Sequence, residues 1–182
     1  MENKSSNLLR IASLEKESIV DGEGLRYTIF TQGCNHNCLG CHNPESHDFL
    51  GGRTVDTNKL FQDIISNPLL DGITLSGGDP FFQAEKLQEL VKKVKNQGLD
   101  VWAYTGFKFE EFIKYINKED CDNRINSSMI ELLKNIDILV DGKFILEQRT
   151  LDSAFKGSKN QRIIDVKKSL NINKIVEYDL KD

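Results

Sequence analysis

The sequence predicts an α/β fold in which a curled, mostly parallel sheet forms a partial (βα) barrel. Short runs of β-branched and aromatic residues alternate with amphipathic helical patterns along the 182 residues. Repeated strand–helix units of this kind give parallel sheets with right-handed crossovers. About four units are present, too few to close an eight-stranded barrel. We expect a single domain over residues 1–182.

Two strand patterns come before the repeated units. Leu8–Ala12 and Arg26–Thr31 are rich in β-branched and aromatic residues, and Asp21–Gly24 between them has the composition of a turn. The second strand leads directly into a cysteine-rich loop. Because α/β folds usually carry their sites at the carboxyl ends of strands, this loop is a candidate site.

The strand–helix units follow in order. Asp56 or Thr57 can cap a first helix that ends at Asn67-Pro68, and a second helix begins near Pro80 and ends at Gly98. The other predicted elements are strands at 72–76, 99–104 and 136–140, helices at 109–116 and from Ser127 or Ser128 to Lys134, a polar loop at 117–126, and short strands at 161–164 and 174–178.

Three of the four cysteines lie in the loop after the second strand, at Cys34, Cys38 and Cys41. Thiolates at this C-x3-C-x2-C spacing can face one centre, and short cysteine loops hold iron–sulfur clusters. Three thiolates hold three irons of a [4Fe–4S] cluster and leave the fourth open to a substrate or cofactor. Zinc with His36, His42 or His47 as a fourth ligand is the alternative, although zinc sites usually take a second, distant ligand pair.

Four polar segments at predicted strand ends should meet on one rim: 34–41, 76–79, 105–106 and 141–143. Such convergence favours a ligand site. Gly77 and Gly78 would let the backbone approach a ligand closely, and Asp79 with nearby carbonyls could hold an ammonium group. Gly-Gly-Asp-Pro is also good turn chemistry, so a plain strand-to-helix turn stays open.

The cysteine spacing resembles that of the radical S-adenosylmethionine (SAM) superfamily, and further motifs narrow the resemblance. In order, they are Val20-Asp-Gly-Glu-Gly-Leu-Arg26, Gln32-Gly-Cys34, Cys41-His-Asn-Pro44, Ile73-Thr-Leu-Ser-Gly-Gly-Asp-Pro80, Trp102-Ala-Tyr-Thr-Gly106, Leu139-Val-Asp-Gly-Lys-Phe144 and Gly157-Ser-Lys-Asn-Gln-Arg162. Together they resemble the activating proteins of anaerobic (class III) ribonucleoside-triphosphate reductases over a core of about residues 19–165. The cysteine loop is also similar to that of pyruvate formate-lyase activating enzymes.

The resemblance implies a cofactor role for each motif. The three loop cysteines would bind a [4Fe–4S] cluster, and Gly77, Gly78 and Asp79 would orient SAM. Many relatives have Glu in place of Asp79. Asp141 and Lys143 would contact the ribose or carboxylate of SAM, with a salt-bridged turn as the alternative.

One departure from the superfamily pattern concerns the cover of the cluster. Radical SAM loops often place an aromatic residue immediately before the third cysteine, where this chain has Gly40. The resemblance implies that His42 takes part of that role beside cluster and adenine. A loop histidine bonded to backbone is the alternative.

The resemblance also implies a reaction and its partners. An external one-electron donor such as flavodoxin or ferredoxin would reduce the cluster, and SAM would be cleaved to methionine and a 5′-deoxyadenosyl radical. That radical would remove a hydrogen atom from a glycine of the large reductase subunit. Three alternatives stay open: another glycyl-radical enzyme such as pyruvate formate-lyase as the target, a small-molecule substrate, or a non-enzymatic zinc-binding interaction module.

Composition indicates which partners and which cellular compartment suit this chemistry. A net charge of −4 argues against nucleic acid as the main partner. The polar start of the chain has no apolar secretory segment, and no run of residues is long and apolar enough to span a membrane. We therefore expect a cytoplasmic protein, whose thiols stay reduced.

Several conspicuous residues are expected to have no chemical role. Cys121, in the polar loop, is interpreted as a free thiol. His36 is expected to be a solvated loop residue and His47 a structural one. Trp102 and Tyr104 alternate along a strand and are interpreted as core residues.

Overall fold

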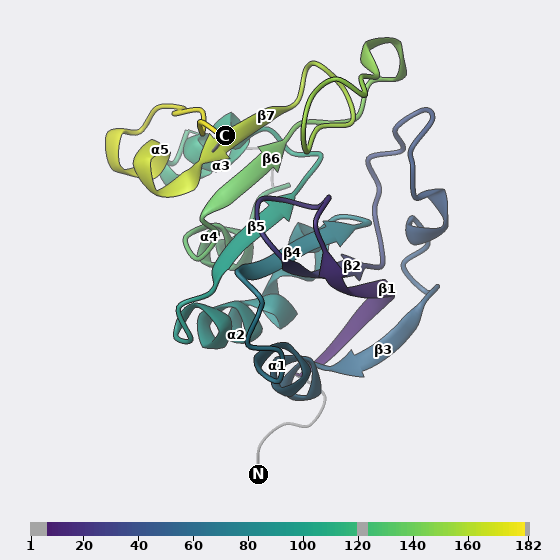
Figure 1. Ribbon diagram of the computed structural model, residues 1–182. Helices are drawn as coiled ribbons and strands as arrows, with labels where there is room; N and C mark the ends of the chain where they lie inside the picture. The colour runs from purple at the N-terminus through teal and green to yellow at the C-terminus, as the bar shows by residue number, and fades with distance from the viewer. Residues whose placement is uncertain (1–6, 120–123, 181–182) are drawn as a thin grey trace.

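The computed structural model describes residues 7–119 and 124–180. Seven strands and five α-helices are present in these residues (Figure 1). The strands are β1 (Leu8–Ser18), β2 (Arg26–Thr31), β3 (Arg53–Asp56), β4 (Gly72–Gly77), β5 (Asp100–Tyr104), β6 (Ile138–Asp141) and β7 (Arg162–Asp165). The helices are α1 (Thr57–Ile65), α2 (Ala84–Lys95), α3 (Phe109–Ile116), α4 (Ser127–Leu133) and α5 (Val166–Ile172). Short 3-10 turns lie at η1 (Pro44–Ser46), η2 (Pro80–Gln83) and η3 (Leu146–Gln148).

The strands form one sheet in the order β3-β1-β2-β4-β5-β6-β7. β2, β4, β5 and β6 are parallel neighbours, whereas β1, β3 and β7 pair antiparallel at the two sides. The predicted α/β class and mostly parallel sheet are therefore confirmed, and the sheet is open rather than closed. Because the four central strands run in one direction, their carboxyl ends meet at one edge (Figure 1).

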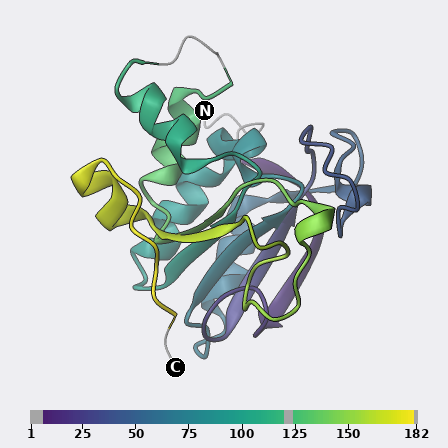
Figure 2. The same ribbon diagram turned by 90° about the horizontal axis from the view of Figure 1, so that it is seen from above.

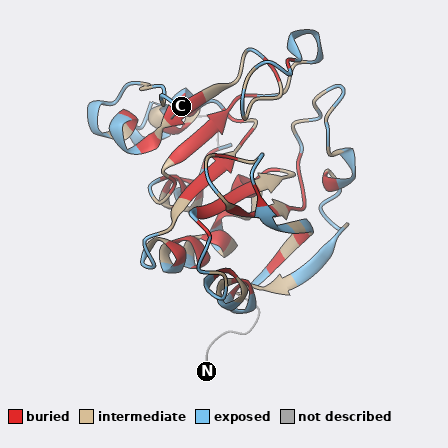
Figure 3. Ribbon diagram, viewed as in Figure 1, coloured by how far each residue is buried: buried red, intermediate tan, exposed pale blue. Residues whose placement is uncertain are grey.

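Alternate residues of β5 pack on opposite faces of the sheet. Val101 and Ala103 belong to the main core, which also contains the inward side chains of α1 to α4. Trp102 belongs to a smaller cluster with Ile138, Val140 and Ile163. The helical layer thus covers one face, while the other lies under loops and the C-terminal segment (Figure 2). Buried residues concentrate along the strands between these layers (Figure 3).

Capping residues explain where the helices begin. The side chain of Asp56 accepts a hydrogen bond from Asn58 N at 2.7 Å, so α1 starts at the predicted place. α4 is capped by Asn126, which accepts from Met129 N at 3.1 Å. The predicted caps Ser127 and Ser128 are already the first residues of that helix.

The prediction was wrong at short or weakly patterned elements. β3, which has no buried residue, and α5, capped by Asp165, were not predicted. The strand predicted at 174–178 contributes only an isolated bridge between Ile164 and Glu177. Cys121 lies outside the described residues.

No helix in the described part of the chain has both the length and the apolar character needed to cross a membrane.

Candidate active site

The carboxyl ends of the four parallel strands surround a cavity of about 450 Å³. Each of the four segments predicted to share a rim contributes to its lining: the thiols of Cys34, Cys38 and Cys41, then Ser76, Gly77 and Gly78, then Thr105 and Gly106, then Gly142 and Lys143. His42 also lines the cavity, whereas Gly40, Asp79 and Asp141 do not. Most of the predicted site therefore converges on one space.

Residues that follow the three cysteines hold the start of the cysteine loop in place. Gly33 N donates to Ser46 O at 2.7 Å, and Cys34 N donates to the carbonyl of His47 at 3.1 Å. Gly33 has φ +100°, and a Cβ added there would lie 2.6 Å from the Phe49 ring. Only glycine fits this turn without strain, so the entry to the loop is fixed before the first thiol.

Each thiol lies near a backbone N–H group. Asn43 N donates to Cys41 Sγ at 3.5 Å. Burial raises the pKa of the Cys34 thiol to about 11, and the backbone N–H of His36 opposes that rise. Burial also raises the pKa of Cys38, opposed by the backbone N–H of Phe144. Backbone N–H groups that face sulfur are among the features that tune iron–sulfur sites.

The donor set fits an iron–sulfur cluster. The three thiols are close enough for the charges of Cys38 and Cys41 to act on Cys34, and they open on one shared cavity. Soft thiolates are the ligands that iron–sulfur clusters take. Among residues 7–119 and 124–180, no group of three or more His, Cys, Asp or Glu side chains is arranged around a single metal ion.

His36 is not the solvated loop residue that the sequence indicated. Its side chain is 8% exposed, and its Nε2 lies 2.8 Å from Oδ2 of Asp79. The ring packs edge-on against Phe107, with 4.7 Å between centroids. A Cβ on Gly106 would lie 2.4 Å from the His36 ring. His36, the middle of the three residues between the first two cysteines, is thus fixed against the end of β5.

Asp79 is fully buried, which explains why its side chain does not reach the cavity. Besides His36, its carboxylate accepts hydrogen bonds from Thr105 Oγ1 at 2.8 Å, Gly106 N at 2.9 Å and Phe81 N at 3.0 Å. All of these partners come from protein. In this structure the carboxylate joins the cysteine loop to the ends of β4 and β5.

The two glycines before Asp79 are packed tightly against the loop. Gly77 has φ +97°, and a Cβ there would lie 2.5 Å from Thr31 N. A Cβ on Gly78 would lie 2.5 Å from the carbonyl oxygen of Gly33. The motif therefore needs glycine for its own packing, and both residues also present backbone to the cavity.

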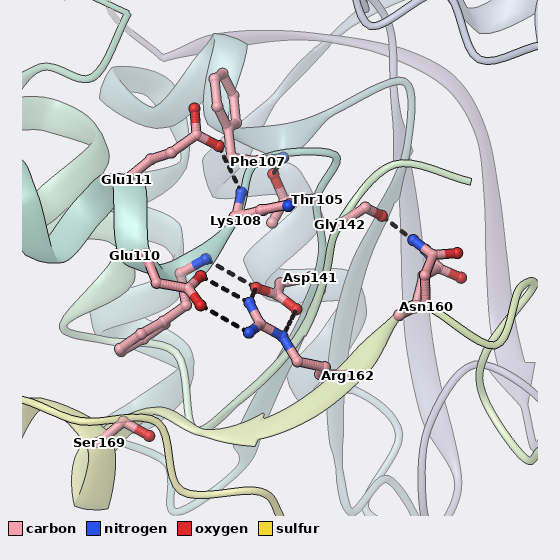
Figure 4. Close-up of polar contacts among 12 residues, drawn as sticks. Thr105, Phe107, Lys108, Glu110, Glu111, Asp141, Gly142, Asn160, Arg162 and Ser169 are labelled. Carbon is pink, nitrogen blue, oxygen red and sulfur yellow. Dashed lines mark hydrogen bonds and ion pairs between the residues drawn. The ribbon is translucent and has the colours of Figure 1, made fainter. Parts of the chain in front are cut away.

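Asp141 belongs to an ion-pair cluster behind the cavity (Figure 4). Its carboxylate is 1% exposed and accepts hydrogen bonds from Phe109 N at 2.7 Å and Arg162 Nε at 2.9 Å. Arg162 also pairs with Glu110 at 2.8 Å. The alternative of a salt-bridged turn therefore describes Asp141. Lys143 differs, because it lines the cavity and its Nζ donates to His36 O at 3.3 Å.

The turn that carries Lys143 is held by two residues whose roles sequence reasoning missed. Asn160 Nδ2 donates to Lys143 O at 2.9 Å, and Gln161 Nε2 donates to Gly142 O at 3.0 Å. Gln161 Oε1 also accepts from Gly157 N at 2.9 Å. The motif Gly157–Arg162 carried the resemblance, but sequence alone offered no reason for it.

Gly40 lies beside Leu146, which comes from the same connection. A Cβ on Gly40, whose φ is +72°, would lie 2.9 Å from Cδ1 of Leu146, so a larger residue there would be strained and would have to displace that side chain. His42 packs against Phe144, with ring centroids 4.8 Å apart. Leu146 and Phe144 thus lie against the loop on either side of its third cysteine.

Comparison with known proteins supports the interpretation of the cysteine loop as an iron–sulfur site. A family described as a 4Fe-4S single cluster domain matches residues 20–164. The anaerobic ribonucleoside-triphosphate reductase-activating protein of Haemophilus influenzae is 36% identical over 155 residues, covering 80% of this chain and 90% of that protein. This chain belongs to the anaerobic ribonucleoside-triphosphate reductase-activating protein family.

Other members of the activating-protein family come from different sources. The protein of Escherichia coli K12 is 33% identical over 153 residues, covering 79% of this chain and 90% of its own length. The protein of Enterobacteria phage T4 is 33% identical over 150 residues, covering 79% of this chain and 86% of its own length. The crystal structure of QueE from Escherichia coli aligns with 58% of this chain at 16% identity and a TM-score of 0.45, a likeness too small to support an argument.

Proposed function

We propose that this chain is the activating enzyme of an anaerobic ribonucleoside-triphosphate reductase. The observation that carries the proposal is the meeting of three thiols and the Gly77-Gly78 backbone in one cavity at the carboxyl ends of parallel strands. Such a space can hold a cluster and a small polar ligand together. Membership in the activating-protein family supplies the class of protein acted upon.

Cys34, Cys38 and Cys41 hold a [4Fe–4S] cluster in this proposal. When bound, the cluster would supply one electron for the reductive cleavage of SAM, with methionine, 5′-deoxyadenosine and a glycyl radical on the reductase as the net products. The protein binds, orients and shields these groups. A flavodoxin or ferredoxin is the proposed external electron donor, and the cytoplasm, which keeps thiols reduced, is the proposed compartment.

The other cavity residues orient SAM. The backbone of Gly77 and Gly78 faces the cavity, and Lys143 brings a positive charge to its edge. Lys143 can meet the carboxylate of SAM, while His42 lies on the same wall beside Phe144. The proposed role of Asp79 is to position the loop through His36, because its own oxygens are engaged with protein donors.

The finer architecture belongs to the same proposal. We infer that the sheet acts as a partial (βα) barrel, with residues 1–182 as one radical SAM domain. The single continuous sheet and the helical layer on one face support this inference. An incomplete barrel leaves a side through which a segment of the reductase can reach the cavity.

The deciding experiment measures 5′-deoxyadenosine formation by anaerobically reconstituted protein given SAM and a strong reductant, with and without the reductase. We expect product that depends on each of the three cysteines, and a glycyl radical signal on the reductase. Absence of product from protein that carries its full iron and sulfide would overturn the proposal. Activation of pyruvate formate-lyase in place of the reductase would change the target.

A further inference from the structure

Two neighbouring cavities are lined in part by the face of the sheet that carries Trp102 and Tyr104. The three loop cysteines line the first. The second has a volume of about 950 Å³, and its lining includes Trp102, Ile138 and Tyr178 together with Lys167 of α5 and four aspartates, Asp71, Asp100, Asp137 and Asp165. Phe155 lines both cavities. The two cavities therefore adjoin at the Phe155 ring. Together they form a larger space than the cavity beside the cysteine loop alone.

Exposed apolar side chains surround the place where the cavities adjoin. Leu151 and Val20 line the first cavity and are 87% and 73% exposed. Ile19 lines the second and is 73% exposed. We name Ile19, Val20, Leu151 and Phe155 the apolar entrance. Single exposed apolar residues are ordinary, but several around one opening indicate a binding surface.

Phe155 has an unfavourable backbone conformation. Its φ of +59° lies in the left-handed region, which an aromatic residue rarely adopts. The ring packs edge-on against Trp102, with 5.4 Å between centroids. Strained residues persist where the surrounding structure fixes them, and they often lie at binding sites. The strain here keeps an aromatic ring between the two cavities.

We propose that the apolar entrance binds the residues flanking the target glycine of the reductase, held as an extended segment. This inference rests on the proposed function. A glycine has no side chain to recognise, so selection must come from its neighbours. Because a polypeptide is continuous, a glycine in the first cavity forces its neighbours across the opening. At about 3.3 Å per extended residue, two neighbours on either side reach the entrance and the second cavity.

Leu151→Glu and Val20→Glu test the proposal, singly and together. Each places a charge in a surface that should become desolvated, so affinity for the reductase should fall about tenfold or more per substitution. Leu69→Glu is the matched control, because Leu69 is 71% exposed but lines neither cavity. Leu151→Met should bind as the unaltered chain does.

The measurement is the dissociation constant of the cluster-loaded protein for the reductase, taken anaerobically without SAM. The expected result is weak binding by the three Glu variants at the entrance and unchanged binding by Leu69→Glu and Leu151→Met. Equal binding by all variants would overturn the inference. If the unaltered chain neither binds nor activates the reductase, the proposed function itself has failed, which is a separate outcome.

Discussion

Nε2 of His36 lies 2.8 Å from Oδ2 of Asp79, and the carboxylate is completely buried. This contact connects His36, in the middle of the segment between the first two cysteines, to the Gly-Gly-Asp-Pro turn after β4. The same carboxylate oxygen accepts from Thr105 and Gly106 at the end of β5. The cysteine loop therefore takes its position from the two central strands, beyond its own sequence.

Replacing Asp79 should destabilise the fold and impair the loop. Asp79→Ala leaves Thr105 Oγ1, Gly106 N and Phe81 N without their acceptor, and we expect a loss of about 3 kcal/mol or more in the free energy of unfolding. Urea unfolding of the cluster-free protein measures this loss. A change below about 1 kcal/mol would show that the hydrogen bonds are not maintained in solution.

The partner variants at His36 separate positioning from general stability. We expect His36→Ala to reduce the iron bound after reconstitution, and His36→Gln, which keeps a side-chain donor, to restore part of it. Iron and sulfide per chain, together with the electron paramagnetic resonance spectrum of the reduced cluster, give the comparison. Equal iron in both variants and the unaltered protein would contradict a positioning role.

Gly77→Ala and Gly98→Ala form a matched pair. Both glycines have positive φ, +97° and +82°, so alanine is strained at either. A Cβ at Gly77 would meet Thr31 N at 2.5 Å, whereas nothing lies within 4 Å of one at Gly98. We expect about 1 kcal/mol of destabilisation at Gly98 and about 2 kcal/mol more at Gly77. Equal losses in urea unfolding would contradict this packing.

Acid should remove the contribution of Glu110 to stability. The hydrogen bond from Arg162 is the largest cause that lowers the pKa of Glu110, from 4.5 to about 2. A depressed carboxyl pKa stabilises the fold above the unfolded value and loses that effect as pH falls from 4.5 towards 2. Because the side chain is 49% exposed, solvent screening limits the effect to less than about 1 kcal/mol.

A comparison of unfolding free energies for the unaltered chain and Glu110→Gln tests the acid effect. The difference should be present at pH 6 and should shrink progressively below pH 4.5. A difference that stays constant down to pH 3 would show that Glu110 titrates normally.

Cys121 offers a control for the three loop cysteines. The sequence predicts a free thiol there, so Cys121→Ser should keep full iron and activity, whereas Cys38→Ala should lose both. Iron analysis after reconstitution, with 5′-deoxyadenosine formation alongside, distinguishes them. Loss of iron in Cys121→Ser would overturn the prediction that this cysteine is free.

Local patterns were enough to predict the strands and helices that place the site. Arg26–Thr31 and Phe109–Ile116 have their predicted bounds, because strong periodicity and clear turn residues surround them. β3 and α5 escaped notice because each is short and lies beside partners that no local pattern reveals. Pairing with β2 also extends β1 to Ser18, beyond the predicted end at Ala12.

Long-range contacts limited the prediction of the site. The cysteines and the glycine pair were predictable because spacing and residue type state their chemistry. His36 was misjudged because its burial depends on Phe107 and Asp79, far along the chain. For Asp141 the sequence left both a ligand role and a salt-bridged turn open, because Arg162, which pairs with it, follows 21 positions later. Sequence reasoning identifies the chemical groups, but it does not reveal which of them are already hydrogen-bonded or ion-paired within the chain.

The connection between β6 and β7 sets an order for maturation. Phe144 provides the N–H beside Cys38, Leu146 lies beside Gly40, and Asn160 with Gln161 holds the turn that bears Lys143. A ribosome-bound chain that ends before residue 161 would have all three thiols but an unfinished enclosure around them. Stable iron incorporation should therefore be an event of late synthesis or of the released protein, which leaves the thiols open to oxidants while the chain is still being made.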